Sequence, residues 1–142
     1  MAAFVKFNKF LEALAEGGHN LGSDTLKFAL TNTAPTAASD TVFAPGTLHP
    51  PPAAANGYTT GGHAATIASS SESGGTYTLA CTTDVVITAT AGGIGPFRYV
   101  ILYNDTSATD LLIGYWDYGS SITLADGETF TIDVTASLLT IT

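Results

Sequence analysis

The chain has 142 residues, 45% of them hydrophobic and 11% charged, and its formal net charge is −8 at pH 7. Beyond residue 27, Arg98 is the only strong base, and an acidic body of this kind repels phosphate and makes nucleic acid an unsuitable partner. No apolar run approaches the roughly 18 residues that a membrane span needs, and the single cysteine, Cys81, excludes an intrachain disulfide. The length fits one domain.

The N-terminal segment predicts an amphipathic helix over residues 3–16. Phe7, Phe10, Leu11 and Leu14 recur at i, i+3, i+4 and i+7, and Gly17-Gly18 is suited to end the helix. A helix this short is stable only when packed, against one end of its own sheet or against a neighbouring subunit. These four residues, together with Phe4, are therefore candidate partner contacts.

A strand is predicted over residues 25–31, where Leu26, Phe28 and Leu30 alternate with polar neighbours. Residues 32–62 then hold all but one of the prolines, which favours an extended loop or arm over core sheet. A loop of this length usually has a function. It either wraps or reaches a neighbouring subunit or is a mobile surface excursion, and the first alternative makes contact candidates of Pro45, Pro50, Pro51 and Pro52.

Short strands with turn signals between them are typical of the rest of the chain. They are predicted over residues 64–69, 76–82, 84–90, 97–103, 111–118, 129–135 and 138–141. Alternation places Phe97, Tyr99, Ile101 and Tyr103 on one face, and Asp126-Gly127 suits a tight hairpin.

The fold class expected from this pattern is mainly β, a β-sandwich or jelly-roll-like single domain with a short N-terminal amphipathic helix and a Pro-rich arm. Residues 63–142 form the β body, to which the strand at residues 25–31 is added.

No motif in the sequence predicts catalysis, a cofactor or a metal. His19, His49 and His63 lack the spacing that zinc ligands show. The carboxylates of the C-terminal half fall at turns or on the outward side of strands, and neither a serine elbow nor a phosphate-binding glycine loop is present. We therefore expect a protein that is not an enzyme.

An aromatic group, Tyr115, Trp116 and Tyr118, lies in the predicted strand at residues 111–118. Alternation places Tyr115 on the face opposite the other two. Trp116 and Tyr118 are candidate partner contacts, and core or subunit-interface packing is favoured over stacking on a sugar or a base.

Several segments resemble small virion structural proteins of tailed bacteriophages, and the resemblance covers nearly the whole chain. They are residues 23–35 (SDTLKFALTNTAP), Asn56-Gly57-Tyr58, Gly61-Gly62, residues 95–99 (GPFRY) and residues 112–121 (LIGYWDYGSS). The resemblance implies a capsid decoration, or cement, protein that binds and stabilises the assembled head shell. It also implies the outer surface of the virion as location, synthesis in the host cytoplasm, and no catalytic residues.

The partners implied are the major capsid protein and further copies of the chain, as a homotrimer. The N-terminal segment holds three of the four strong bases, Lys6, Lys9 and Lys27, and is the first candidate for shell contact. Two alternatives stay open. One is a tail or neck subunit, such as a tube, terminator or adaptor protein, and the other is a host-glycan-binding module that uses Trp116 and Tyr118.

Overall fold

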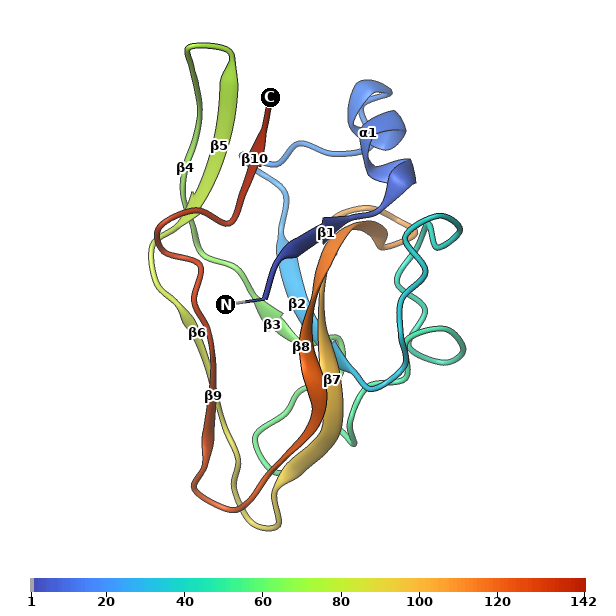
Figure 1. Ribbon diagram of the computed structural model, residues 1–142, viewed down its shortest axis with the longest axis vertical. Coiled ribbons are helices and arrows are strands. Elements are labelled where there is room, and N and C mark those ends of the chain that lie inside the picture. The colour runs from blue at the N-terminus through green and yellow to red at the C-terminus, as the bar shows by residue number, and fades with distance from the viewer. Residues whose placement is uncertain (1) are drawn as a thin grey trace.

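Within the described residues, the strands form three antiparallel sheets and a single helix lies near the N-terminus (Figure 1). This computed structural model describes residues 2–142. The elements are β1 (Phe4–Lys6), α1 (Asn8–Ala15), β2 (Leu26–Thr31), β3 (His63–Ala64), β4 (Ile67–Ser73), β5 (Thr76–Cys81), β6 (Val85–Thr88), β7 (Ile94–Asn104), β8 (Leu111–Leu124), β9 (Thr129–Ile132) and β10 (Leu139–Ile141). The expected mainly β fold with a short N-terminal helix is confirmed.

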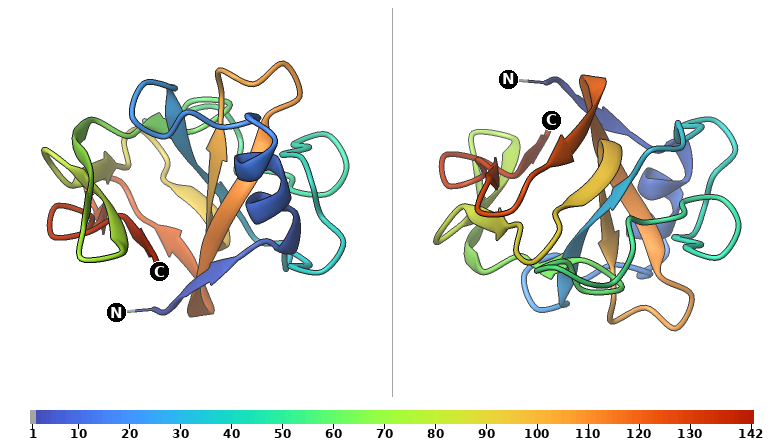
Figure 2. Two further views of the ribbon diagram at one scale, coloured as in Figure 1. Left: turned by 90° about the horizontal axis from the view of Figure 1, so that it is seen from above. Right: turned by 90° about the horizontal axis from the view of Figure 1, so that it is seen from below.

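The largest sheet has five strands in the order β1-β8-β7-β2-β3, and its centre is the long β7–β8 hairpin. Strands β10, β5 and β4 form a three-stranded sheet, and β6 and β9 form a two-stranded one. Figure 2 shows the two smaller sheets facing the same side of the large sheet. The arrangement is sandwich-like.

The main core fills the space between the large sheet and the two smaller ones. From the large sheet it takes Phe28, Leu30 and Leu102, and from the smaller sheets Leu79 and Ile87. All five are fully or almost fully buried. Alternation along each strand places these side chains on the inner face, so that hydrophobic burial joins the three sheets into one unit.

A second, smaller core covers the outer face of the large sheet. Ile101, Tyr103 and Leu112 point to this face, and Phe7 and Phe43 pack on them. Phe43 belongs to the Pro-rich segment at residues 32–62, which folds back over the sheet (Figure 2). This segment therefore covers the chain's own sheet. The sequence had suggested only two roles for it, contact with a neighbouring subunit or a mobile surface loop.

The N-terminal prediction needs correction. Residues 4–6 are a strand, not helix, because β1 pairs with the edge of β8, with Phe4 opposite Trp116. The helix α1 begins only at Asn8. Phe7 and Phe10 are buried within the chain, 0% and 1% exposed, so the helix packs against its own sheet.

Three further differences concern strand faces and connections. The register of β7 shifts between Phe97 and Tyr99, and Phe97 joins the main core while Ile101 and Tyr103 face the other side. The single-face prediction for these residues is therefore wrong at Phe97, because a β-bulge reverses the alternation. The region predicted as one strand at residues 64–69 divides into β3 and β4.

The connections between strands also differ. Asp126-Gly127 joins β8 to β9, which lie in different sheets, so this turn is not a hairpin. A tight hairpin is found at Gly74-Gly75 between β4 and β5, and both glycines have positive φ.

Candidate partner-binding surface

An apolar hollow of about 210 Å³ opens at the surface between β8 and β9. These strands belong to different sheets, and the hollow leads from solvent toward the main core. Its lining is Ala2, Val100, Trp116, Tyr118, Phe130, Thr131, Ile132, Asp133 and Val134.

Period-2 alternation brings the aromatic side chains of this hollow together. Trp116 and Tyr118 point to the same side of β8, and Phe130 faces them from β9. The ring centroids of Tyr118 and Phe130 lie 5.9 Å apart at an interplanar angle of 69°. This edge-to-face contact is a favourable aromatic geometry.

The two aromatic residues of β8 differ in exposure. Tyr118 is 58% exposed and is among the few large hydrophobic side chains that face solvent. Trp116 is only half-buried and packs on Phe4 at 5.0 Å and on Phe28 at 6.0 Å between ring centroids. Tyr118 is therefore the residue of this surface that is most available to a partner, while Trp116 supports it from the core side.

A bulge in β8 displays Tyr118. Asp117 pairs with Tyr99 across the hairpin, whereas the next registered pair is Ile122 with Phe97. Arg98 holds the Asp117 carboxylate by two hydrogen bonds of 2.7 and 2.9 Å, and the Gly119 N–H donates to the same carboxylate at 2.8 Å.

These bonds lower the pKa of Asp117, first through the Arg98 hydrogen bond. The carboxylate therefore stays ionised at neutral pH and fixes the chain on both sides of Tyr118.

The side chains of this surface are chemically suited to binding an apolar or a sugar group. Three aromatic rings with an apolar floor suit an apolar side chain of a partner protein, since aromatic residues are enriched in protein interfaces. Asp133 and Thr131 at the rim are polar, and aromatic faces beside polar groups also suit a sugar ring.

The sequence-predicted contact residues are distributed over several places. Phe4, Trp116 and Tyr118 come together at or next to the hollow. Phe7, Phe10 and Pro52 are buried in the chain's own fold and lie outside the hollow's lining. Leu11 and Pro50 are exposed, and Leu14, Pro45 and Pro51 are partly buried; all five lie outside the hollow's lining.

Sequence reasoning missed Phe130, Ile132 and Val134 as part of this surface. Their period-2 alternation places them on one face, which is the core face. The pattern carries no information on which other strand that face meets, because β8 and β9 pair in different sheets. No sequence signal predicts the contact of Tyr118 with Phe130.

The three histidines lie in separate parts of the fold. His19 Nδ1 is 3.2 Å from Asn104 Nδ2, His49 is bound to Asp40, and the His63 ring lies 5.8 Å from that of Tyr58. Burial is the largest influence on each of these imidazoles and lowers all three pKa values. Within residues 2–142, no three metal-ligating side chains group together.

The chain matches no protein-family model, and comparisons with curated proteins and with solved structures give no match. In residues 2–142 there is also no helix with the length and hydropathy to cross a membrane.

Proposed function

We propose that the protein is a non-enzymatic structural component of a phage virion, and specifically a capsid decoration protein that binds and stabilises the assembled head shell. The observation that carries the proposal is the exposed aromatic side chain of Tyr118 over an apolar hollow. Such a surface suits protein contact. The sequence resemblance to tailed-phage virion proteins supplies the context.

The distribution of charge supports the same proposal. Nine of the twelve acidic residues and only one strong base lie beyond residue 27. An acidic body is compatible with the outside of a shell and unfavourable beside packaged DNA. The partners proposed are the major capsid protein and other copies of this chain, as a homotrimer.

The fold supplies a rigid body for such a role. Both faces of the large sheet are covered, the inner face by the smaller sheets and the outer face by residues of the Pro-rich segment and Phe7. A protein that binds many equivalent positions on a shell gains affinity when its binding surface is preorganised, because little conformational entropy is lost on binding.

The copy number of the protein in purified particles tests the proposal. We expect hundreds of copies, counted by mass spectrometry against the major capsid protein, and the same number on emptied heads without tails. Tens of copies, or loss of the protein with the tails, would move it to the tail or neck. Absence of the protein from particles would refute a virion role.

A host-glycan-binding module is the second candidate, and the hollow itself is the observation that favours it. Trp116, Tyr118 and Phe130 line the hollow beside the carboxylate of Asp133. A glycan array with the purified protein tests this candidate. Binding that Tyr118→Ala abolishes would support it, and absence of binding from an array that covers host surface glycans would count against it.

A further inference from the structure

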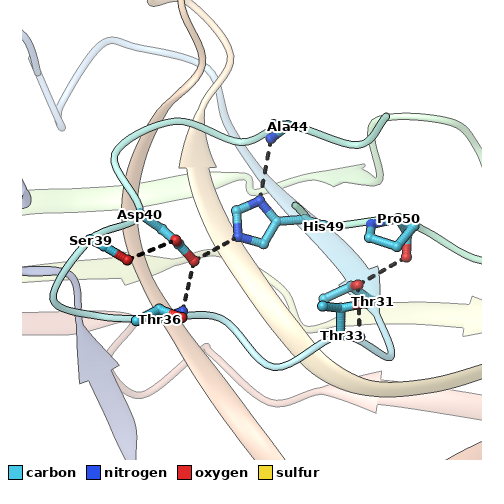
Figure 3. A network of polar contacts seen from close by, with 8 residues as sticks. All are labelled: Thr31, Thr33, Thr36, Ser39, Asp40, Ala44, His49 and Pro50. Carbon is cyan, nitrogen blue, oxygen red and sulfur yellow. Dashed lines mark hydrogen bonds and ion pairs between the residues drawn. The ribbon is translucent and has the colours of Figure 1, made fainter. Parts of the chain in front are cut away.

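The side chain of His49 is completely buried within the Pro-rich segment. Figure 3 shows its polar contacts from close by. Its partner Asp40 is also largely buried, with a side chain 11% exposed. The two residues lie nine positions apart and close the part of the segment that carries Phe43. We refer to residues 36–49 as the strap.

The hydrogen bonds of His49 define its protonation state. The Ala44 N–H donates to Nδ1 at 3.3 Å, so Nδ1 must carry a lone pair. The proton of the neutral ring is therefore on Nε2, which donates to Asp40 Oδ2 at 3.2 Å. The same carboxylate oxygen accepts the Thr36 N–H at 2.7 Å, and Figure 3 shows the three groups in one network.

The imidazole also holds an aromatic stack against the large sheet. The His49 ring lies parallel to Phe43, with centroids 5.9 Å apart, and Phe43 stacks on Tyr103 of β7 at 4.4 Å. Phe43 is 5% exposed and Tyr103 is 2% exposed. The strap thus seals one face of the second core.

The remaining attachments of the strap are backbone bonds. The Phe43 N–H donates to Asp110 O at 2.8 Å, the Leu112 N–H to Thr41 O at 3.1 Å, and the Asn8 N–H to Ala37 O at 2.9 Å. Opening of the strap must break these three bonds and the stack of Phe43 on Tyr103.

We propose that His49 is an acid-sensitive latch, whose protonation at Nδ1 releases the strap from the large sheet and uncovers Phe43 and Tyr103. A proton on Nδ1 would oppose the Ala44 N–H and leave two donors facing each other. It would also place a second charge in a site from which water is largely excluded. Opening of the strap relieves both costs, because the imidazolium is then hydrated.

The carboxylate of Asp40 attracts a protonated His49 and so opposes release of the strap, but only in part. In the part of the chain that the structure describes, Asp40 is the charged side chain found against the imidazole, and β7 presents the phenol of Tyr103 behind Phe43. Burial, the largest influence, lowers the pKa of His49, and the hydrogen bond and charge of Asp40 raise it by less. The neutral ring is thus the form that the closed strap favours.

A nearby carboxyl group needs a control. Asp110, whose backbone accepts the Phe43 N–H, has a pKa raised first by burial and then by Asp105. Because burial raises this pKa, protonation of Asp110 in acid favours the closed form, which is opposite in sign to the effect expected from His49. The variant Asp110→Asn removes this titration and leaves His49 unchanged.

Hydrogen exchange followed by mass spectrometry tests the latch. Exchange times at pH 8, 7, 6 and 5 are first corrected for the intrinsic pH dependence of amide exchange. We expect strap peptides to lose protection about tenfold for each pH unit once His49 titrates, while β7 peptides keep theirs. The proposal would be overturned if strap and β7 peptides lost protection equally, or if protection of the strap peptides were unchanged at pH 5.

Variants assign the effect to His49. His49→Gln retains an N–H donor for Asp40 and cannot be protonated in this pH range, so strap exchange should become independent of pH. His63→Gln, at a half-buried histidine outside the strap, and Asp110→Asn should both keep the wild-type response. A pH response that survives in His49→Gln and disappears in either control would refute the latch.

A measurement on the wild-type chain remains decisive if His49→Gln fails to fold. Long-range ¹H–¹⁵N spectra distinguish the two imidazole nitrogens directly. We expect the Nε2–H tautomer for His49 at pH 7.5 and protonation that coincides with opening of the strap. An Nδ1–H tautomer, or an imidazole that is already charged at pH 7.5, would contradict the proposal.

Discussion

Tyr118 and Phe130 meet edge to face, with ring centroids 5.9 Å apart, although their strands lie in different sheets. The contact joins β8 of the large sheet to β9 of the smallest sheet at the mouth of the apolar hollow. Although Tyr118 is 58% exposed, its ring is therefore held in place by an aromatic contact. This combination of order and exposure underlies the proposed partner contact.

Tyr118→Ser is expected to weaken binding of the protein to phage heads while the fold is retained. Tyrosines at interface hot spots contribute about 2 kcal/mol or more, so the dissociation constant should rise roughly 30-fold. Co-sedimentation of the purified variant with heads that lack the wild-type protein measures this. Val86→Ser, at a residue that is 54% exposed on β6, is the matched control and should bind as wild type. Equal losses in both variants would argue against a specific role of Tyr118.

Trp116→Ala is expected to destabilise the fold by about 3 kcal/mol, the lower end for an aromatic truncation in a core. The residue is half-buried, and its ring packs on Phe4 and Phe28. Urea denaturation followed by circular dichroism measures the loss, and Trp116→Phe should recover most of it. A Trp116→Ala variant with wild-type stability would show that the ring is a surface group, as the glycan-binding alternative requires.

Gly62→Ala is expected to destabilise the protein by at least about 2 kcal/mol, through backbone strain and a steric clash. Gly62 has φ +84°, and a Cβ added there would overlap the carbonyl oxygen of Phe28 on β2. Gly74→Ala is the control, since it also has positive φ, +60°, but open space around it. Its cost should be only about 1 kcal/mol. Equal thermal midpoints for the two variants would contradict the clash.

Acid is expected to lower the free energy of unfolding through the three histidines, of which His19 and His49 are buried and His63 is half-buried. Burial lowers the pKa of His19, His49 and His63 in the folded state below the ordinary value of 6.5. The unfolded chain therefore binds protons first. The stability contribution is complete above pH 6.5 and is lost as the pH falls through 6.5 toward the folded pKa values.

Each histidine can lower the free energy of unfolding by up to about 1.4 kcal/mol per pH unit in that window. Urea midpoints at pH 8 and at pH 5 measure the sum. The triple variant His19→Gln, His49→Gln, His63→Gln should lose this pH dependence above the range where carboxylates titrate. A wild-type midpoint that is unchanged at pH 5 would contradict the folded-state pKa shifts.

The Pro-rich segment illustrates what the sequence could not predict. Five prolines correctly indicated that residues 32–62 do not form core sheet. The same segment buries Phe43 and His49 against or near Tyr103, which is distant in sequence. Neither residue has a local pattern, because an irregular segment has no fixed period that would place its apolar residues on one face.

The N-terminal helix illustrates a competition between local and tertiary preference. Its apolar spacing is real, and Phe10 is buried as that spacing predicts. Residues 4–6 nevertheless form β1, because the edge of β8 supplies backbone partners to an extended chain. Tertiary hydrogen bonding outweighs a weak helical propensity at the end of a short helix.

By itself, the sequence determined the mainly β class, the positions of most strands and the opposite faces of Tyr115 and Trp116, since these follow from period-2 alternation and turn residues. Only the tertiary structure decided that β9 faces β8 across a sheet boundary, that Phe97 turns to the main core, and that His49 is buried on Asp40. The physical reason is that alternation is a local property of a strand. Bulges, sheet pairing and the burial of an irregular segment depend on contacts between residues far apart in the chain.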